Sequence, residues 1–505
     1  MYLSKTKYCS AVQCPKILWM EKNMPEQFDD SVRDIQRMNM GNCVGELAMG
    51  YFGDFTEVPW SDNKSEMLHE TELLIQNRTP VICEAAFTYE GNFCIVDILR
   101  VFNDCVEIVE VKSSTREKDN TSGKIADIYL HDMAYQYYVL TNCGLNVRSV
   151  SLMNLNSSYV RQGELDIKQL FVLTDCTDSV SDMQTDIPDR LNAIEKVALS
   201  DNEPEIVIGS RCDSPYECGY KGWCWRHLPE DNVFTIGMSM RGSVKEEAYL
   251  VGKVSFADVL NGEVKLSERQ RRRVETVLFD LPPYINKPGI KAFLDGLSYP
   301  VYHFDFETFQ QPIPLWDGVR PYMHIPFQYS LHIQHEDGSL THKEFLGKEG
   351  EDPRRALAER ICEDIPPGAC VLAWYMPFEK GRLSQLAELF PDLAGHLLNI
   401  DEDIQDLRDP FSKGDYYCKE MGGSSSLKTV LPALFPNDPE LDYANLELIH
   451  HGGEAMEAFA TLHKKSPEEI AEIRTALLAY CKMDTLAMVK IFERLWDLVA
   501  EGVSS

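Results

Sequence analysis

Two carboxylates and a lysine in the first quarter of the chain have the spacing of a metal-dependent hydrolytic centre. Asp97 lies in one apolar run, and Glu110 and Lys112 lie two positions apart in the next. Residues i and i+2 of a strand face the same side, so Glu110 and Lys112 are expected to project together beside Asp97. Such a cluster is costly on an apolar sheet unless a cation joins it. Carboxylates suit Mg²⁺ or Mn²⁺, which would polarise a phosphoryl group, while Lys112 would stabilise the nucleophile or the developing charge.

Two strands and a helix are expected to position these groups. Residues 93–99 and 106–112 are largely apolar and rich in Val and Ile, and turn residues lie between them, which is typical of a β-hairpin. Residues 125–140 have helical periodicity and carry Gln136, which places an amide on a helix after the strands. A surface hairpin with a solvated salt bridge is the alternative, because an Asp followed by Glu-x-Lys is by itself a weak pattern.

A group of cysteines indicates a different kind of site, built from thiolates. Cys212, Cys218 and Cys224 are evenly spaced in a loop that contains Gly and Pro. Three thiolates leave a soft-metal centre one ligand short, and either Cys9 or Cys14 can complete it. Cys14 is preferred because the proline after it fixes the chain direction. Zinc, which also accepts four thiolates, and a set of unrelated cysteines are the alternatives.

Residues 1–230 resemble the RecB-type branch of the PD-(D/E)XK nucleases, and more closely the CRISPR-associated exonucleases of that branch that contain an iron–sulfur cluster. The resemblance implies a [4Fe-4S] cluster held by one cysteine ahead of the nuclease core and three behind it. It also implies an Asp, a (D/E)xK strand, and a following helix with a Gln and a nearby Tyr. The matching residues, in order, are Cys14, Asp97, Glu110, Lys112, Gln136, Tyr138, Cys212, Cys218 and Cys224.

One position departs from that family. Where the family often has a His in its first helix, this chain has Glu46, an acid that serves as a metal ligand in other branches of the superfamily. Glu84 lies on the strand before the one that carries Asp97, and it is expected either to approach the metal or to be a solvated strand charge. The candidate metal ligands of the first half are therefore Glu46, Glu84, Asp97 and Glu110.

A second group of acids lies in the C-terminal half. Asp305 and Glu307 alternate with aromatic residues on an apolar strand, so both carboxylates share one face. Residues 473–498 predict a long amphipathic helix, on which Tyr480 and Asp484 lie four positions apart and point together. These residues predict a second acidic site.

The second acidic site resembles that of the metal-dependent 3′–5′ exonucleases of the RNase H-like superfamily, in which two cations straddle the scissile phosphate. The resemblance implies that Asp305, Glu307 and Asp484 bind metal and that Tyr480 orients the attacking water. Those exonucleases usually carry a central Asp, and Glu379 takes that place here, directly after a predicted strand. A degenerate, structural domain is the alternative. Other candidates for the central acid are Asp401, Asp403, Asp406 and Asp409.

Two further segments of the C-terminal half contain residue types that can bind phosphate or metal. Residues 421–428 are rich in Gly and Ser and precede a predicted helix. Their amides and Lys428 are suited to hold a phosphate, and a flexible loop with a helix cap is the alternative. His450 and His451 are adjacent and would point apart on a regular element, so a loop is expected there rather than a metal site.

Composition limits these interpretations. The chain has 505 residues, of which 44% are apolar and 26% charged, as in a soluble globular protein with two or three domains. We expect a nuclease domain at 1–230, a helical connector at 231–295 and an exonuclease-type domain at 296–505. No apolar run approaches the ~18 residues of a membrane span, and the N-terminus lacks the apolar stretch of a signal peptide. Several cysteines lie in or beside apolar runs, so a reduced, cytoplasmic protein is expected.

The net charge of −31 argues against a protein that coats nucleic acid non-specifically, because phosphate contacts need Lys and Arg. It does not exclude a nuclease, since a local basic track can still guide a strand. The segment 269–273 has four arginines, and the solvated face of a helix is the alternative for it. Lysines 5, 7, 16 and 22 are the other candidates for such a track.

The sequence thus predicts an α/β protein, with a restriction-endonuclease-like domain joined through a helical connector to an RNase H-like domain. The whole chain resembles a bacterial family that fuses these two halves. The expected function is metal-dependent hydrolysis of DNA, by exonuclease action on single-stranded ends, in repair or defence. An RNA exonuclease that uses the C-terminal site, or a nucleic-acid-binding scaffold with degenerate sites, are the alternatives. No membrane partner is expected, and the oligomeric state is left open.

Overall fold

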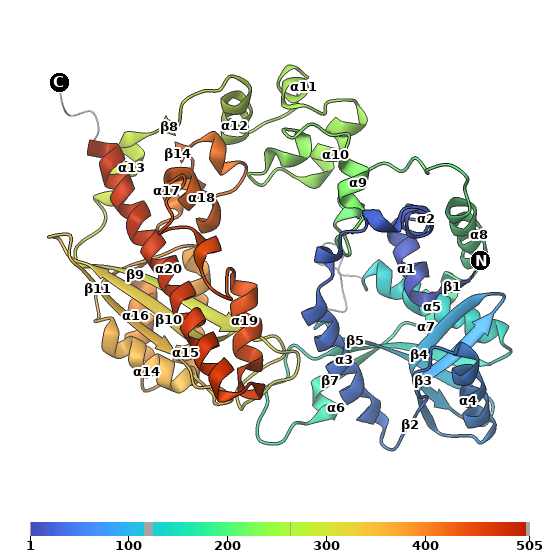
Figure 1. Ribbon diagram of the computed structural model, residues 1–505. Coiled ribbons are helices and arrows are strands. Elements are labelled where there is room, and N and C mark those ends of the chain that lie inside the picture. The colour runs from blue at the N-terminus through green and yellow to red at the C-terminus, as the bar shows by residue number, and fades with distance from the viewer. Residues whose placement is uncertain (1, 116–124, 263, 501–505) are drawn as a thin grey trace. The chain divides into compact units, whose positions relative to one another are not determined.

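The computed structural model describes residues 2–115, 125–262 and 264–500. Helices and strands alternate in both halves, which confirms a mixed α/β protein (Figure 1). By internal contacts the chain divides into two units. The first comprises Met1–His227 and Gln311–Met323, and the second comprises Leu228–Gln310 and His324–Ser505.

A mixed seven-stranded sheet forms the centre of the first unit. Strands β3 (Val81–Tyr89), β4 (Asn92–Val101) and β5 (Val106–Lys112) form an antiparallel meander, which confirms the predicted hairpin. Strand β6 (Val147–Leu155) runs parallel to β5, and helix α5 (Asp127–Asn142) makes the crossover that parallel pairing requires. The sheet is completed by β2 (Thr56–Glu57) beside β3, β7 (Phe171–Asp175) beside β6, and β1 (Leu3–Ser4), which pairs with β4.

Helices cover both faces of this sheet. On one face the core contains residues of α1 (Lys5–Gln13), α4 (Lys64–Gln76) and α5. On the other face it contains residues of α3 (Ile35–Met49). The remaining helices of the unit are α2 (Lys16–Asn23), α6 (Ile167–Leu170), α7 (Thr177–Asp182), α8 (Ile187–Ala198) and α9 (Lys221–Trp225).

The second unit is built on a five-stranded sheet of order β11-β10-β9-β12-β13. The pairs β11–β10 and β10–β9 are antiparallel, whereas β12 and β13 run parallel to β9. Along β9, Tyr302, Phe304 and Phe306 alternate with residues that face the other side, as the period of a strand requires. The strands are β9 (Val301–Phe309), β10 (Ile325–Gln334), β11 (Leu340–Leu346), β12 (Cys370–Ala373) and β13 (Ile404–Asp406).

Two layers of helices enclose the second sheet. One face packs against α14 (Arg354–Asp364), α15 (Met376–Leu389) and α16 (Ala394–Asp403). The long C-terminal helix α20 (Pro467–Ala500) crosses the other face, next to α13 (Lys287–Leu294) and α18 (Leu427–Leu434) (Figure 1). Shorter elements are α17 (Asp409–Ser412), α19 (Gly452–Thr461), and the two-stranded ribbon of β8 (Tyr284–Ile285) and β14 (Tyr416–Tyr417).

Residues 231–295 are mostly helical, as the sequence predicts. They contain α10 (Gly242–Leu250), α11 (Phe256–Asn261), α12 (Glu268–Leu278) and α13. Their contacts are mainly with the second unit, since the segment is grouped with it. Among the described residues no helix is both long and apolar enough to span a membrane.

Candidate functional site

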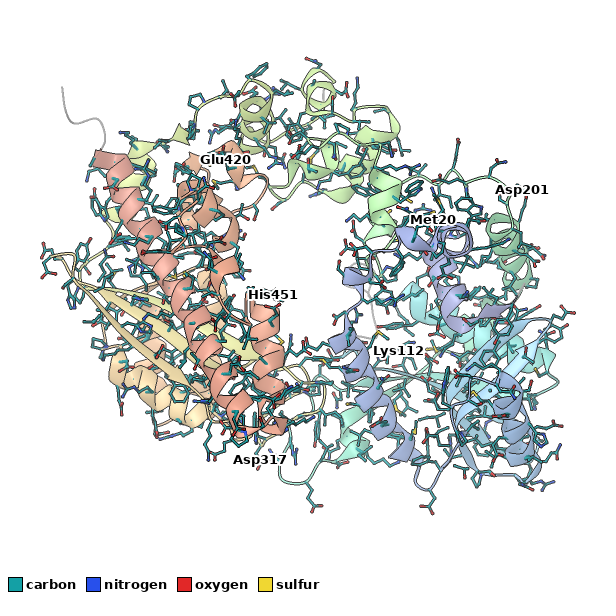
Figure 2. The ribbon with its side chains drawn as sticks, viewed as in Figure 1. Met20, Lys112, Asp201, Asp317, Glu420 and His451 are labelled. Carbon is teal, nitrogen blue, oxygen red and sulfur yellow. The ribbon has the colours of Figure 1, made fainter. Side chains whose placement is uncertain are left out.

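The first candidate site lies where β5 meets α5. Glu110, at the end of β5, is only 1% exposed. Lys112 donates to its Oε1 at 2.6 Å, and Gln136 of α5 donates to its Oε2 at 2.6 Å. The structure therefore brings together three residues that the sequence analysis grouped, although they lie on two elements. Lys112 is labelled in Figure 2.

Two residues of this site were missed or misassigned from the sequence. The ammonium of Lys5 lies 3.1 Å from both carboxylate oxygens of Glu110 and 3.8 Å from Asp97. Asp132 accepts from Lys112 at 2.7 Å and from Gln136 at 3.0 Å, and it lies 3.6 Å from Lys5. Lys5 therefore belongs to the site and not to the proposed surface track. Asp132 precedes Gln136 by one helical turn, so the i, i+4 rule could have identified it.

Charge and burial oppose each other at Glu110. Burial, together with Asp132 and Asp97, raises the pKa of Glu110 to about 7 despite the two lysines. Asp132 behaves in the opposite way: burial would raise its pKa, but Lys112 and Lys5 lower it below the usual value. Asp132 is therefore the more firmly ionised of these two acids.

Asp97 is held by the backbone of the neighbouring strand β5. Its carboxylate accepts the Val111 amide at 2.7 Å, beyond the last paired residues of the β4–β5 ladder. On the other side, Glu84 has a φ of +57°, and the β3–β4 register runs normally on both sides of it. A positive φ costs free energy for a residue other than glycine, and such residues cluster at functional sites.

An open pocket of about 590 Å³ extends from Asp97, and Glu46, Glu57 and Glu84 also line it. Burial, followed by Asp97, raises the pKa of Glu84 to about 7. The proposed ligands therefore fall into two groups. Glu46, Glu84 and Asp97 face a solvent-filled space, whereas the oxygens of Glu110 already contact lysines. Glu57 was not foreseen, because its strand β2 is too short to predict.

The cysteines form a separate site. Cys14, at the C-terminal end of α1, lines one pocket together with Cys212, Cys218 and Cys224. Cys9, the alternative fourth ligand, lies instead near Asp132 and Lys112. Burial raises the pKa values of three of these thiols, that of Cys218 to about 11.

The acids of the C-terminal half gather between β9 and α20. The side chains of Glu307 and Asp484 are buried, and Asp305 lies on the same face of β9, where its carboxylate approaches the sulfur of Cys481 at 4.0 Å. One oxygen each from Asp305 and Glu307 and the sulfur of Cys481 lie within 4.8 Å of one another. Tyr480 is buried one turn before Asp484.

These acids repel one another. Burial first, then neighbouring carboxylates, raise the pKa values of Asp305 and Glu307 well above normal. Burial also raises the pKa of Asp484 to about 6, although the Tyr443 hydroxyl donates to it. Lys428 is the cation whose charge acts on all three acids, and burial lowers its pKa. Ionised carboxylates packed this closely destabilise the folded state when no metal is bound.

Glu379, the residue predicted as the central acid, is close enough to the second site to act on its carboxylates. It lies in the first turn of α15, is buried, and adds to the raised pKa values of Asp305 and Glu307. Burial raises its own pKa to about 8, and one of its carboxylate oxygens is buried without a hydrogen-bond partner. Asp406, another candidate, instead accepts the amides of Tyr375 and Met376 at 3.1 and 3.2 Å and so caps α15.

The remaining candidates lie on other elements of the second unit. Asp409 opens the short helix α17 and pairs with Lys413, and Asp401 and Asp403 lie on α16. His451, labelled in Figure 2, accepts the amide of Glu454 and caps α19, as expected of a loop residue. A Cβ added to the next residue, Gly452, would lie 3.7 Å from Glu307, so this loop borders the second site.

Comparison with known proteins gives one match. Residues 302–426 match a family described as a domain of unknown function (DUF2779). The matched segment contains Asp305, Glu307 and Glu379 but ends before Tyr480 and Asp484. Comparisons with curated proteins and with solved structures found no match.

Proposed function

We propose that this protein is a metal-dependent nuclease that hydrolyses phosphodiester bonds of DNA, with one hydrolytic centre in each unit. The observation that carries the proposal is the close approach of three acids in the second centre. Asp305, Glu307 and Asp484 come from segments up to 179 positions apart in the sequence, yet they lie close enough that burial and the charge of Asp484 raise the pKa values of both Asp305 and Glu307. A fold retains such mutual repulsion when the acids serve a bound cation.

The strand order supports the fold assignment. Three antiparallel strands followed by two strands parallel to the first, in the order β11-β10-β9-β12-β13, are the arrangement of an RNase H-like sheet. In the first unit, an antiparallel meander followed by a helix and a parallel strand agrees with a restriction-endonuclease-like core. Since a fold does not determine a function, the argument depends on the sites.

The donor atoms of the second centre fit Mg²⁺ or Mn²⁺, which prefer carboxylate oxygens. Asp305, Glu307 and Asp484 would hold the ions, which when bound polarise the phosphoryl group and lower the pKa of the attacking water. Tyr480 is positioned to orient that water. Lys428 lies 4.9 Å from the ring centroids of Tyr480 and Tyr443, close enough to stabilise the charge that develops on the phosphate.

The first centre fits the same chemistry, with more charge compensation. Asp97, Glu46 and Glu84 offer carboxylates to the open pocket, and Glu110 offers a fourth where Lys5 now lies. Lys112 is held between Glu110 and Asp132, so its ammonium is fixed in position to stabilise the nucleophile. Gln136 orients both acids through its amide group.

We further propose that Cys14, Cys212, Cys218 and Cys224 hold a [4Fe-4S] cluster. Four thiolates around a Zn²⁺ ion, at about 2.3 Å each, require sulfur atoms about 4 Å apart. Within the described part of the chain, no three of these sulfur atoms lie within 4.8 Å of one another. The four thiols line one pocket, and the choice of a cluster over Zn²⁺ rests on the family resemblance. The role of the bound group would be to tie the N-terminal helices to the end of the unit.

Separate variants of the two centres test the nuclease proposal. Asp97→Ala and Asp305→Ala proteins are incubated with end-labelled DNA and RNA in Mn²⁺ and in EDTA. The proposal expects Asp97→Ala to lower DNA cleavage at least about 100-fold at the first centre. DNA cleavage that survives Asp97→Ala undiminished would refute the proposal that the first centre hydrolyses DNA. Loss of RNA cleavage in Asp305→Ala alone would favour an RNA exonuclease.

A further inference from the structure

An exposed tyrosine in an unfavourable backbone conformation lies beside the second centre. Tyr375 precedes α15, the helix that carries Glu379, and has φ +74° and ψ +58°, in the left-handed region. Its side chain is 51% exposed. Bulky residues seldom adopt this conformation, in which glycine or asparagine would cost less. The carboxylate of Asp406 holds Tyr375 there by accepting its amide at 3.1 Å.

The same carboxylate positions an arginine next to that tyrosine. Asp406 accepts the amide of Arg408 at 3.0 Å. The guanidinium carbon of Arg408 lies 5.4 Å from the centroid of the Tyr375 ring, within cation–π range. Its Nε donates to the hydroxyl of Ser425 at 2.9 Å. One acid therefore fixes an aromatic ring and a cation side by side and links them to the Gly/Ser-rich loop.

That loop leads directly to the carboxylates. Ser425 lies three residues before Lys428, whose ammonium contacts the rings of Tyr480 and Tyr443. Tyr443 in turn donates to Asp484. The loop 422–428 thus connects two sets of contacts: Arg408 and Tyr375 at Ser425, and Tyr480 and Tyr443 of the second centre at Lys428.

Two arginines of α12 lie near the loop 422–428 or near Arg408. Arg273 of α12 is 5% exposed, and two of its guanidinium nitrogens are buried without a hydrogen-bond partner. One of them, Nη1, lies 3.2 Å from where a Cβ of Gly422 would be. Arg269 has a buried, unpaired Nε as well. Burial, and then the neighbouring charge of Arg408, lower the pKa of Arg269.

We propose that Tyr375, Arg408 and the loop 422–428 form a subsite for single-stranded nucleic acid, in which the Tyr375 ring stacks on a base and Arg408 binds the adjoining phosphate. The inference rests on the proposed nuclease function and names the strand-binding residues of its second centre. A cation and an exposed ring are the two components that bind single strands without sequence preference. Arginines that cluster in a chain of net charge −31 create a local positive potential, which favours an anionic ligand such as a phosphate.

The direct test is photo-crosslinking of the full-length protein to a short single-stranded oligonucleotide that contains 5-iodouracil, in EDTA to prevent cleavage. We expect a crosslink to Tyr375, mapped by mass spectrometry. Tyr375→Asn removes the ring while tolerating the left-handed backbone. This variant should abolish that crosslink and weaken binding about tenfold, the effect of losing one stacked base.

The phosphate contact is tested by fluorescence anisotropy with a labelled oligonucleotide over a range of salt concentrations. Arg408→Gln should reduce the slope of log K against log salt by about 0.7, the value for one phosphate of a single strand. Arg355→Gln is the matched control, because Arg355 is an arginine of the same unit already paired with Asp392 and Glu359. Ser425→Ala removes the hydrogen bond to Arg408 without removing the charge, and so separates loop disturbance from phosphate binding.

The outcomes separate the two proposals. If the wild-type protein binds and cleaves the oligonucleotide, but neither the Tyr375 crosslink nor the slope change appears, the subsite is refuted and the nuclease function stands. If the wild-type protein neither binds nor cleaves single-stranded DNA or RNA, the nuclease proposal fails, and the subsite fails with it.

Discussion

Replacing Asp484 by asparagine should make the metal-free protein more stable, because it removes one charge from a buried cluster of like charges. Asparagine keeps the shape of the side chain and an oxygen that can accept from Tyr443. In the folded protein the pKa of Asp484 is raised from 3.8 to about 6. A raised carboxylate pKa means that the folded state binds its proton more tightly than the unfolded state does. The folded state is therefore progressively destabilised as pH rises through this interval.

The size of the effect follows from that shift. About two pKa units at roughly 1.4 kcal/mol each amount to about 3 kcal/mol at any pH above about 6. For a unit of this size, the melting temperature of Asp484→Asn should exceed that of the wild type by roughly 5–10 °C in EDTA at about pH 8. The advantage should shrink as pH falls through 6 and vanish at about pH 3 or below, where the wild-type side chain is protonated in both the folded and the unfolded state.

Thermal unfolding in EDTA and in Mn²⁺ measures this difference, with the transition of the second unit followed separately. Bound Mn²⁺ at 100 times its dissociation constant should stabilise the wild type by about 2.7 kcal/mol. Asp484→Asn should gain much less stability from Mn²⁺. The difference in melting temperature between the two proteins should therefore shrink or change sign when metal is added. An Asp484→Asn protein that melts below the wild type in EDTA at about pH 8 would refute the reasoning. It would mean that the carboxylate stabilises the fold.

Three further predictions concern the other sites. Lys5→Met leaves Glu110 with one lysine fewer, so it should lower metal-free stability by about 3 kcal/mol and strengthen Mn²⁺ binding, both visible in thermal shifts; an unchanged melting temperature would contradict the assigned contact. Glu379→Gln should remove the activity of the second centre without loss of stability. Asp406→Ala deletes three hydrogen bonds to backbone amides, so it should lower the free energy of unfolding by about 2–3 kcal/mol. The reverse pattern would make Asp406 the central acid. Cys218→Ser should remove the visible absorbance of protein purified with iron, which thiolate-ligated iron produces; colourless wild-type protein containing zinc would refute the cluster.

The sequence predicted those parts of the sites that depend on local periodicity. The two-residue period of a strand placed Glu110 with Lys112 and Asp305 with Glu307, and the helical period placed Tyr480 with Asp484. Each of these pairs is bound to share a face once the element type is correct. The hairpin and the mixed α/β class followed from the same patterns.

Contacts that depend on tertiary structure were missed. Lys5 is more than 100 positions from Glu110, and nothing in its surroundings distinguishes it from the nearby lysines 7, 16 and 22. Lys16 was also assigned to the basic track, but it is buried in an ion pair with Glu203 at 2.7 Å. Tyr443, which donates to Asp484, begins a 3₁₀ helix of three residues, which is too short to show a periodic pattern in the sequence. Tyr138, matched to the family tyrosine, packs against Tyr89, with ring centroids 6.1 Å apart.

The most direct test of the central claim is hydrolysis by the doubly substituted protein. Wild-type protein and an Asp97→Ala/Asp305→Ala variant, purified identically, are incubated with end-labelled single-stranded DNA in Mn²⁺, and the products are resolved on a denaturing gel. The account predicts shortened products from the wild type, none in EDTA, and none from the double variant in Mn²⁺. Equal cleavage by both proteins, or no cleavage of DNA or RNA by the wild type in Mn²⁺ or Mg²⁺, would contradict it.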